Sequence, residues 1–242
     1  MSVIQLLNVR PTVIIPAFNE AANLARVLDD VRGSGIGAEI VVVDDGSTDA
    51  TGQVARSHGA TLLRHPFNMG YGTALQTGYK HALRTGSPLV IQMDADGQHG
   101  ATEIPKLLAP LERDECDLVI GSRFLQPTDY RMGFAKSLGR EFFRFTARLS
   151  GLTVTDPTSG FQAMNRKVID LYCADFFPHD YPDVDVLLAA HRAGLRVREC
   201  AVEMSEGVRA SSLHGGFRDF YYVYKVMLSL WAIWTGGLGR KR

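Results

Sequence analysis

Two apolar runs, each followed directly by carboxylates and a glycine, most constrain how this chain can fold. The first lies within residues 40–46 (Ile-Val-Val-Val-Asp-Asp-Gly) and the second within residues 89–97 (Leu-Val-Ile-Gln-Met-Asp-Ala-Asp-Gly). A β-branched apolar run of this length is typical of a strand buried on both faces of a parallel sheet. Ligands bind beyond the carboxyl ends of such strands, so we expect both acidic clusters to face one crevice.

Asp94 and Asp96, the carboxylates of the second cluster, are spaced for a shared task. In an extended segment, side chains two residues apart leave the same side of the chain. Two carboxylates at a buried strand end repel each other unless a cation is present. Oxygen ligands suit a hard divalent cation such as Mg²⁺ or Mn²⁺, and such a cation suits a diphosphate. The cluster therefore indicates a nucleotide-sugar site.

Strand-like and helix-like patterns alternate along the first half of the chain, which favours an α/β fold with a mostly parallel, doubly wound sheet flanked by helices. Strands are predicted at residues 12–16, 40–43, 61–63, 89–93, 118–120 and 196–202. Helices are predicted at residues 21–32, 72–85, 104–111, 133–150, 168–177 and 183–193, with one more beginning at the capping residues 47–49. Residues 155–160 are expected to form a polar loop.

Composition narrows the class of protein. The 242 residues include 26 Lys plus Arg and 26 Asp plus Glu, so no basic excess supports nucleic-acid binding. Cys116, Cys173 and Cys200 are odd in number and widely spaced, which predicts reduced thiols in a cytoplasmic protein. The first ten residues lack the pattern of a signal peptide.

The C-terminal segment differs from the rest, so we divide the chain into a catalytic domain at residues 1–216 and a C-terminal amphipathic helix with a basic tail at 217–242. Its apolar stretch of about 15 residues is short of the ~20 needed to cross a bilayer. One interpretation is an interfacial helix at the inner face of the cell membrane, with Arg240, Lys241 and Arg242 near anionic lipids. The other is a helix that packs on the sheet or joins two subunits in an oligomer.

Six segments in order resemble the family-2 glycosyltransferases of the glycosyltransferase-A fold. Within that family they resemble the dolichol- or polyprenyl-phosphate mannose synthase group. The segments are VIIPAFNE at 13–20, VVDDGSTD at 42–49, NMG at 68–70, QMDADGQH at 92–99, GSR at 121–123 and DPTSGF at 156–161. A lone Asp-x-Asp would be weak evidence, whereas six ordered segments are specific.

The resemblance implies a role for each matching position. Pro16, Phe18 and Glu20 correspond to residues that frame the nucleoside, and Asp45 to a carboxylate that contacts the base or ribose. The implied metal ligands are Asp94, Asp96 and Gln98, with Asp96 and Gln98 the more direct. Nucleotide-sugar binding is implied for Pro16, Phe18, Glu20, Val43, Asp45, Asp94, Ala95, Asp96, Arg123 and Arg209.

Catalytic roles are implied for Asp96, Arg123 and Asp183. Arg123 corresponds to an arginine that stabilises the diphosphate leaving group, because a guanidinium fork grips phosphate oxygens in two places. Asp183 corresponds to an acidic segment at the acceptor end, with Asp156 a second candidate for the base. Arg140 and Arg209 correspond to the phosphate or acceptor region. Residues 208–214 (VRASSLH) depart from the family's loop, which puts a second cationic contact in doubt.

The resemblance implies a metal-dependent, inverting transfer from a nucleoside-diphosphate sugar, GDP-mannose or a UDP-hexose, to a polyprenyl or dolichyl phosphate. Transfer to a saccharide hydroxyl in cell-surface polysaccharide synthesis is one alternative. Another is an aspartate-based phosphohydrolase, in which Asp94 would be the nucleophile and Asp96 the acid. A third is a non-catalytic scaffold that binds partners through its C-terminal helix.

Several of these positions also have purely structural interpretations. Asp44 is expected to cap the turn after its strand, and Gly70 with Gly72 to form a structural turn rather than a phosphate cradle. A hydrogen-bonded structural role is favoured for His99 over metal contact. Asp183 is equally compatible with an N-cap of its helix.

Overall fold

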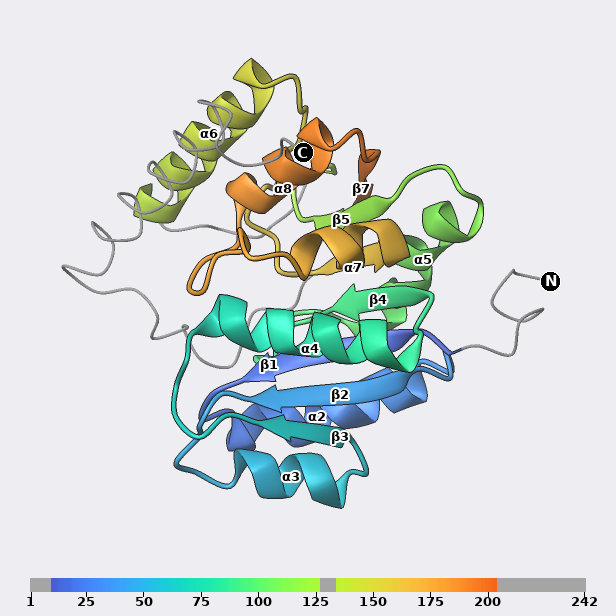
Figure 1. Cartoon of the computed structure of the whole chain (residues 1–242), viewed down its shortest axis with the longest axis vertical. Helices are drawn as coiled ribbons and strands as arrows, with labels where there is room; N and C mark the ends of the chain where they lie inside the picture. Colours follow the sequence, from blue (N-terminus) through green and yellow to red (C-terminus); the bar gives the residue numbers. More distant parts are fainter. Residues whose placement is uncertain (1–9, 127–133, 204–242) are drawn as a thin grey trace.

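The computed structural model describes residues 10–126 and 134–203 (Figure 1). The strands are β1 (Thr12–Ala17), β2 (Glu39–Asp44), β3 (Thr61–Arg64), β4 (Leu89–Gln92), β5 (Leu118–Ser122), β6 (Gln162–Asn165) and β7 (Val197–Ala201). The helices are α2 (Ala21–Gly33), α3 (Thr51–Ser57), α4 (Tyr71–Thr85), the 3₁₀ turn η1 (Ala101–Glu103), α5 (Ile104–Glu112), α6 (Phe134–Leu149), α7 (Arg166–Tyr172) and α8 (Val184–Arg192).

In this described part of the chain the strands form one seven-stranded sheet in the order β3-β2-β1-β4-β6-β5-β7. The α/β class with a mostly parallel sheet is therefore confirmed. The exception is β6, which runs antiparallel to both β4 and β5. We did not predict β6, because its sequence Gln-Ala-Met-Asn has neither a β-branched run nor an alternating pattern. Pairing with a neighbour on each side compensates for this weak local preference.

Helices cover both faces of the sheet, with α4, α7 and α8 on the near face in Figure 1 and α2 and α5 behind it. Alternate side chains of the central strands supply the two cores. Ile14 faces the core beneath α4, and its neighbours Val13 and Ile15 face the core beneath α2. Gly78 lets α4 lie close to the sheet, because a Cβ there would come within 2.4 Å of Ile14 Cγ2.

Most predicted elements agree with the structure to within two residues at each end. The predicted helix at 168–177 is the main exception, since α7 begins at Arg166 and ends at Tyr172. Asn165 causes the early start, because its side chain accepts hydrogen bonds from the backbone N–H groups of Lys167 and Val168. All three cysteines, which lie within the described residues, are free.

The predicted C-terminal helix and basic tail, together with Arg209, lie outside the described residues. Among residues 10–126 and 134–203, no helix has the length and apolar character needed to span a bilayer.

Candidate active site at the carboxyl ends of the strands

The two acidic clusters meet at the first turn of α4. The Asp45 carboxylate accepts hydrogen bonds from the backbone N–H groups of Met69 and Gly70, both at 2.9 Å. Gly70 immediately precedes Tyr71, whose hydroxyl donates to Asp94 Oδ1 at 2.7 Å. Parallel pairing of β1 with both β2 and β4 brings these strand ends to one edge of the sheet. The two acidic clusters therefore lie at the same edge of the sheet, as expected.

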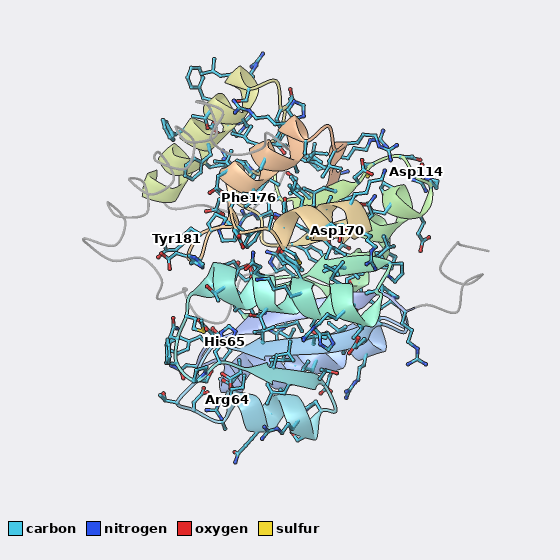
Figure 2. The ribbon with its side chains drawn as sticks, viewed as in Figure 1. Arg64, His65, Asp114, Asp170, Phe176 and Tyr181 are labelled. Carbon is cyan, nitrogen blue, oxygen red and sulfur yellow. The ribbon has the colours of Figure 1, made fainter. Side chains whose placement is uncertain are left out.

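Asp45 is buried, and its carboxylate has three hydrogen-bond partners, all between β3 and α4. Besides the two backbone donors, His65 Nδ1 lies 2.6 Å from Asp45 Oδ1, and His65 Nε2 lies 2.9 Å from Thr77 Oγ1. Figure 2 shows His65 at the end of β3, on the same side of the molecule as the start of α4. Asp45 thus fastens the loop before α4, and its contact with a base or ribose stays a prediction.

Asp44 caps the turn after β2, as expected. Its Oδ1 accepts the backbone N–H of Ser47 at 2.8 Å, and its Oδ2 lies 3.3 Å from Arg64 Nε. The turn also requires Gly46, whose φ is +74° and where a Cβ would come within 2.5 Å of the Phe67 backbone.

Asp94 is held on both carboxylate oxygens. His99 Nε2 lies 3.3 Å from Oδ2, opposite the Tyr71 bond, and the His99 ring stacks on Phe161 at 4.9 Å. Burial alone would raise the pKa of Asp94. The hydrogen bond and charge of His99, followed by the Tyr71 hydroxyl and the charge of Arg123, outweigh burial and lower that pKa. The hydrogen-bonded structural role of His99 is the one this geometry favours.

Asp96 lies in the opposite electrostatic environment. Burial and the negative charge of Asp94, joined by that of Glu20, raise the pKa of Asp96, although it accepts the backbone N–H of Gln98 at 2.9 Å. No Lys, Arg or His side chain of the described residues forms an ion pair with it. A cation would relieve this repulsion, so Asp96 fits a divalent metal ion.

The described residues contain no group of three or more His, Cys, Asp or Glu side chains arranged to hold a metal. A cation at Asp96 would therefore need other oxygen donors. Mg²⁺ in particular is commonly bound through one or two carboxylates, with the remaining ligands being water and substrate phosphates. The Gln98 side chain is a further oxygen donor two residues away.

Arg123 follows β5 and is held by Asp156 in a two-point ion pair. Its Nε lies 2.6 Å from Asp156 Oδ2 and its Nη2 lies 2.7 Å from Asp156 Oδ1. Asp156 is completely buried, and Glu199 accepts the backbone N–H groups of Thr155 and Asp156 at 2.7 and 2.8 Å. This geometry indicates that Asp156 orients the Arg123 guanidinium. It disfavours Asp156 as the catalytic base.

The Asp156 loop also lies against Asp94. A Cβ at Gly160 would come within 2.5 Å of Asp94 Oδ2, so only glycine allows this approach. The charge of Arg123 contributes to the lowered pKa of Asp94. The loop thus brings the predicted leaving-group arginine to the predicted metal cluster.

Two guanidinium groups contact the ring of Phe124. Arg140, on α6, lies 3.9 Å from the ring centroid and Arg123 lies 5.5 Å from it. Arg140 Nη2 donates to Glu141 at 2.8 Å, while its buried Nε has no hydrogen-bond partner among the described residues. Arg140 and Arg123 thus lie against the same ring, and the role of Arg140 at a phosphate stays a prediction.

The loop after β1 supplies the other predicted nucleoside contacts. Pro16 pairs with Val43 in the sheet, and both are buried, as is Ala95. The ring of Phe18 is 44% exposed and suits stacking on a base. Glu20 accepts from Asn23 at 2.9 Å, and its charge reaches Asp96. Of these residues, Glu20 is the one whose charge acts on the acidic cluster, and the ligand contacts of all of them stay predictions.

Asp183 occupies the N-cap position of α8, but within the described residues its side chain does not cap the helix. Its backbone N–H donates to Asp185 Oδ1 at 3.0 Å. The preceding segment packs on the start of α4, where a Cβ at Gly72 would come within 2.0 Å of the Pro178 carbonyl oxygen. Figure 2 shows Tyr181 near this end of α4. The N-cap position of Asp183 is confirmed, although its side chain makes no capping hydrogen bond to the described residues, and its catalytic role stays a prediction.

Tyr71 and Gln92 are the polar residues of this region that sequence reasoning missed. Tyr71 was hidden in a glycine-rich turn and Gln92 in an apolar strand. A tyrosine at the first position of a helix, next to a strand-end acid, was the available signal.

Comparison with known proteins identifies the family. Residues 12–172 match the model described as Glycosyl transferase family 2. The chain belongs to this family. It is 31% identical to a polyprenol monophosphomannose synthase of Mycolicibacterium smegmatis, with 97% of this chain and 92% of the relative covered. It is 30% identical to an undecaprenyl-phosphate mannosyltransferase of Micrococcus luteus, with 94% and 97% covered.

The fold agrees with a solved structure as well. A glucosyl-3-phosphoglycerate synthase from Mycobacterium tuberculosis, in complex with Mn²⁺ and UDP-glucose, superposes with a TM-score of 0.72. The alignment covers 97% of this chain and 82% of that one, at 22% identity. The predicted glycosyltransferase-A fold and family 2 membership are confirmed. The chain is thus a family 2 glycosyltransferase.

Proposed function

We propose that this family 2 enzyme is a metal-dependent, inverting transferase that moves a hexose from a nucleoside-diphosphate sugar to a polyprenyl phosphate. The observation that carries the proposal is the electrostatic contrast at Asp94, Asp96 and Arg123. Asp96, whose pKa is raised, lies beside Asp94, whose pKa is lowered in part by the charge of Arg123. The relatives named for polyprenyl-phosphate substrates support the choice of acceptor.

On the donor side, Asp96 and Gln98 would hold Mg²⁺ or Mn²⁺, with Asp94 beside them. When bound, such a cation neutralises charge that develops on the departing diphosphate. Arg123 donates to the same leaving group, and Asp156 keeps its guanidinium plane fixed. Phe18 stacks on the base of the nucleotide. The Mn²⁺ and UDP-glucose bound by the mycobacterial synthase support this arrangement.

On the acceptor side, the Nε of Arg140, which has no hydrogen-bond partner among residues 10–126 and 134–203, supports a phosphate acceptor. A phosphate is already an anion, so it attacks the anomeric carbon without a strong base. The attack comes from the face opposite the diphosphate, which inverts the configuration. A saccharide hydroxyl would instead need a base such as Asp183.

The phosphohydrolase hypothesis is disfavoured, because Tyr71 and His99 contact both oxygens of Asp94, which would have to be the nucleophile.

A thermal-shift panel followed by transfer assays tests the proposal. With GDP-mannose, UDP-glucose and UDP-N-acetylglucosamine at about 100 times the dissociation constant, one nucleotide class should raise the melting temperature by about 5–10 °C when Mn²⁺ is present. That donor should then transfer to a polyprenyl phosphate and not to a soluble saccharide. Transfer to the saccharide alone would overturn the acceptor proposal, and no stabilisation by any nucleotide sugar would overturn the donor proposal.

A lipid acceptor also requires contact with the membrane, and α6 offers a surface for it. Phe142, Phe145 and Leu149 are exposed at helical spacing on one face, while Phe143 and Ala147 pack into the core. We propose that this face lies on the lipid surface, with the enzyme peripheral at the inner side of the cell membrane.

Vesicle flotation tests the α6 surface. The wild-type protein should float with vesicles that contain anionic lipid, and a Phe145→Glu/Leu149→Glu variant should lose at least about tenfold in partitioning, because two apolar side chains leave the lipid. Phe67→Glu is the matched control, since Phe67 lies in the loop before α4 and is about as exposed as Phe145 (64%, against 60%). Equal flotation of the α6 variant and the wild type would discard this surface.

A further inference from the structure

Three hydrogen-bonded polar side chains, two of them buried, connect the core beneath α4 with Asp94. The Tyr79 hydroxyl donates to Gln92 Oε1 at 2.5 Å, Gln92 Nε2 donates to the Tyr71 hydroxyl oxygen at 3.2 Å, and Tyr71 donates to Asp94 Oδ1 at 2.7 Å. We call Tyr79, Gln92 and Tyr71 the relay. Tyr71, the first residue of α4, and Tyr79, near its middle, come from the same helix, and Gln92 is the last residue of β4.

The direction of every hydrogen bond in the relay follows from the charge at its end. An ionised Asp94 only accepts, so the Tyr71 hydroxyl must donate to it. The Tyr71 oxygen is then the acceptor for the Gln92 amide, and the Gln92 carbonyl is left to accept from Tyr79. Bonds that point the same way polarise one another, so the bond to the carboxylate is strengthened.

Packing alone does not account for these polar groups. Tyr79 is fully buried and its ring contacts Tyr172 and Phe177, an environment that phenylalanine would fill equally well. Gln92 is also buried, on a strand that is otherwise apolar. Buried hydroxyl and amide groups cost stability unless they are paired. Burial raises the pKa of Tyr71 and of Tyr79 well above the usual value, so both keep the proton they donate.

Asp94 is also confined on its other side. His99 contacts the second oxygen, the stacked Phe161 fixes the His99 ring, and Gly160 leaves no space for a Cβ beside the carboxylate. Asp96, by contrast, accepts from the backbone of its own turn. The two acids of the cluster therefore differ in how rigidly they are held.

We propose that the relay is a positioning device that fixes the Asp94 carboxylate for binding of the metal–nucleotide donor, with Tyr71 as its decisive member. The inference rests on the proposed function and deepens it by naming residues that act through Asp94. None of the three relay residues needs to touch the donor. Their contribution is to remove the rotational freedom of Asp94 before the donor arrives.

Titration calorimetry of Mn²⁺ with UDP or GDP, together with kcat and KM for the donor, tests this role. Tyr71→Phe should weaken nucleotide binding and lower kcat/KM by about 10- to 100-fold, the range expected for a hydrogen bond to a charged group. Tyr79→Phe, one bond further away, should have a smaller effect of about threefold. Tyr172→Phe is the matched control: its hydroxyl is buried in the same aromatic cluster but donates to the Val186 carbonyl at 3.4 Å.

A double-mutant cycle separates positioning from general damage to the fold. In an Asp94→Asn background, Tyr71→Phe should add less than about twofold, because the group it orients is already lost. Three results would overturn the positioning role of the relay in an enzyme that still binds its donor. They are additive losses in the double variant, a loss in Tyr172→Phe equal to that in Tyr71→Phe, and unchanged nucleotide binding in Tyr71→Phe. A wild-type protein that binds neither nucleotide would contradict the proposed function itself.

Discussion

Asp96→Ala is expected to reduce metal-dependent sugar transfer by at least about 10³-fold while the protein stays as stable as the wild type or becomes more stable. The activity is lost because the cation loses its principal protein ligand. Stability is not lost because Asp96 is an unfavourable charge in the folded protein. Transfer assays and chemical denaturation at pH 7 measure the two effects separately.

The sign of the stability effect follows from the pKa. Burial and the charge of Asp94 raise the pKa of Asp96 above its usual value, so the ionised form is less favourable in the folded than in the unfolded chain. This penalty is present above the raised pKa and disappears as the pH falls below the unfolded pKa. Removing the carboxylate at pH 7 therefore removes a penalty.

Asp94 should behave in the opposite way. Burial raises its pKa, but the bonds from His99 and Tyr71 outweigh burial and lower it, so ionised Asp94 stabilises the fold. That contribution is present above the unfolded pKa and is lost as the pH falls through the folded pKa.

The control for Asp96→Ala is Asp29→Ala. The Asp29 side chain is 66% accessible, so this variant should leave activity and stability unchanged. A large loss of stability in Asp96→Ala would show that Asp96 supports the fold.

Arg123→Met is expected to lower kcat by about 10²–10³-fold and to destabilise the protein by about 3–5 kcal/mol. The first effect is the loss of the guanidinium from the leaving group. The second arises because Asp156, which is completely buried, would lose its ion-pair partner. Single-turnover assays and denaturant unfolding measure the two effects.

A double variant separates these two effects of Arg123. Arg123→Met/Asp156→Asn removes both charges of the pair, so most of the lost stability should return while activity stays low. Arg123→Lys keeps the charge without the fork and should fall between wild type and Arg123→Met. Recovery of wild-type activity in the double variant would contradict a leaving-group role for Arg123.

The parallel part of the fold was predictable because β1, β2 and β4 are continuous apolar runs whose ends coincide with polar loops. The strand β6 was not, because Gln162 and Asn165 carry no periodic signal and are held by pairing on both sides. Its antiparallel direction depends on neighbours distant in sequence. Local preference weakens as a predictor wherever tertiary pairing supplies the stability.

The candidate site, like the fold, was predictable from the sequence only in part. Asp94, Asp96 and Arg123 were found from short motifs, and the structure groups the loops that carry them. The partners that define their chemistry lie far away in the sequence: Asp156 is 33 residues from Arg123, and Tyr71 is 23 residues from Asp94. Asp45 illustrates the limit, since its motif suggested a ligand contact whereas its described partners belong to the loop before α4.

The role of a divalent ion at Asp96 is tested most directly by the electron paramagnetic resonance spectrum of Mn²⁺ titrated with enzyme and UDP or GDP. Our account predicts that the free Mn²⁺ signal disappears when wild-type enzyme and nucleotide are both present, and that it persists with Asp96→Ala under the same conditions. Equal loss of the signal in both proteins, or tight nucleotide binding by the wild type in the presence of EDTA, would contradict it.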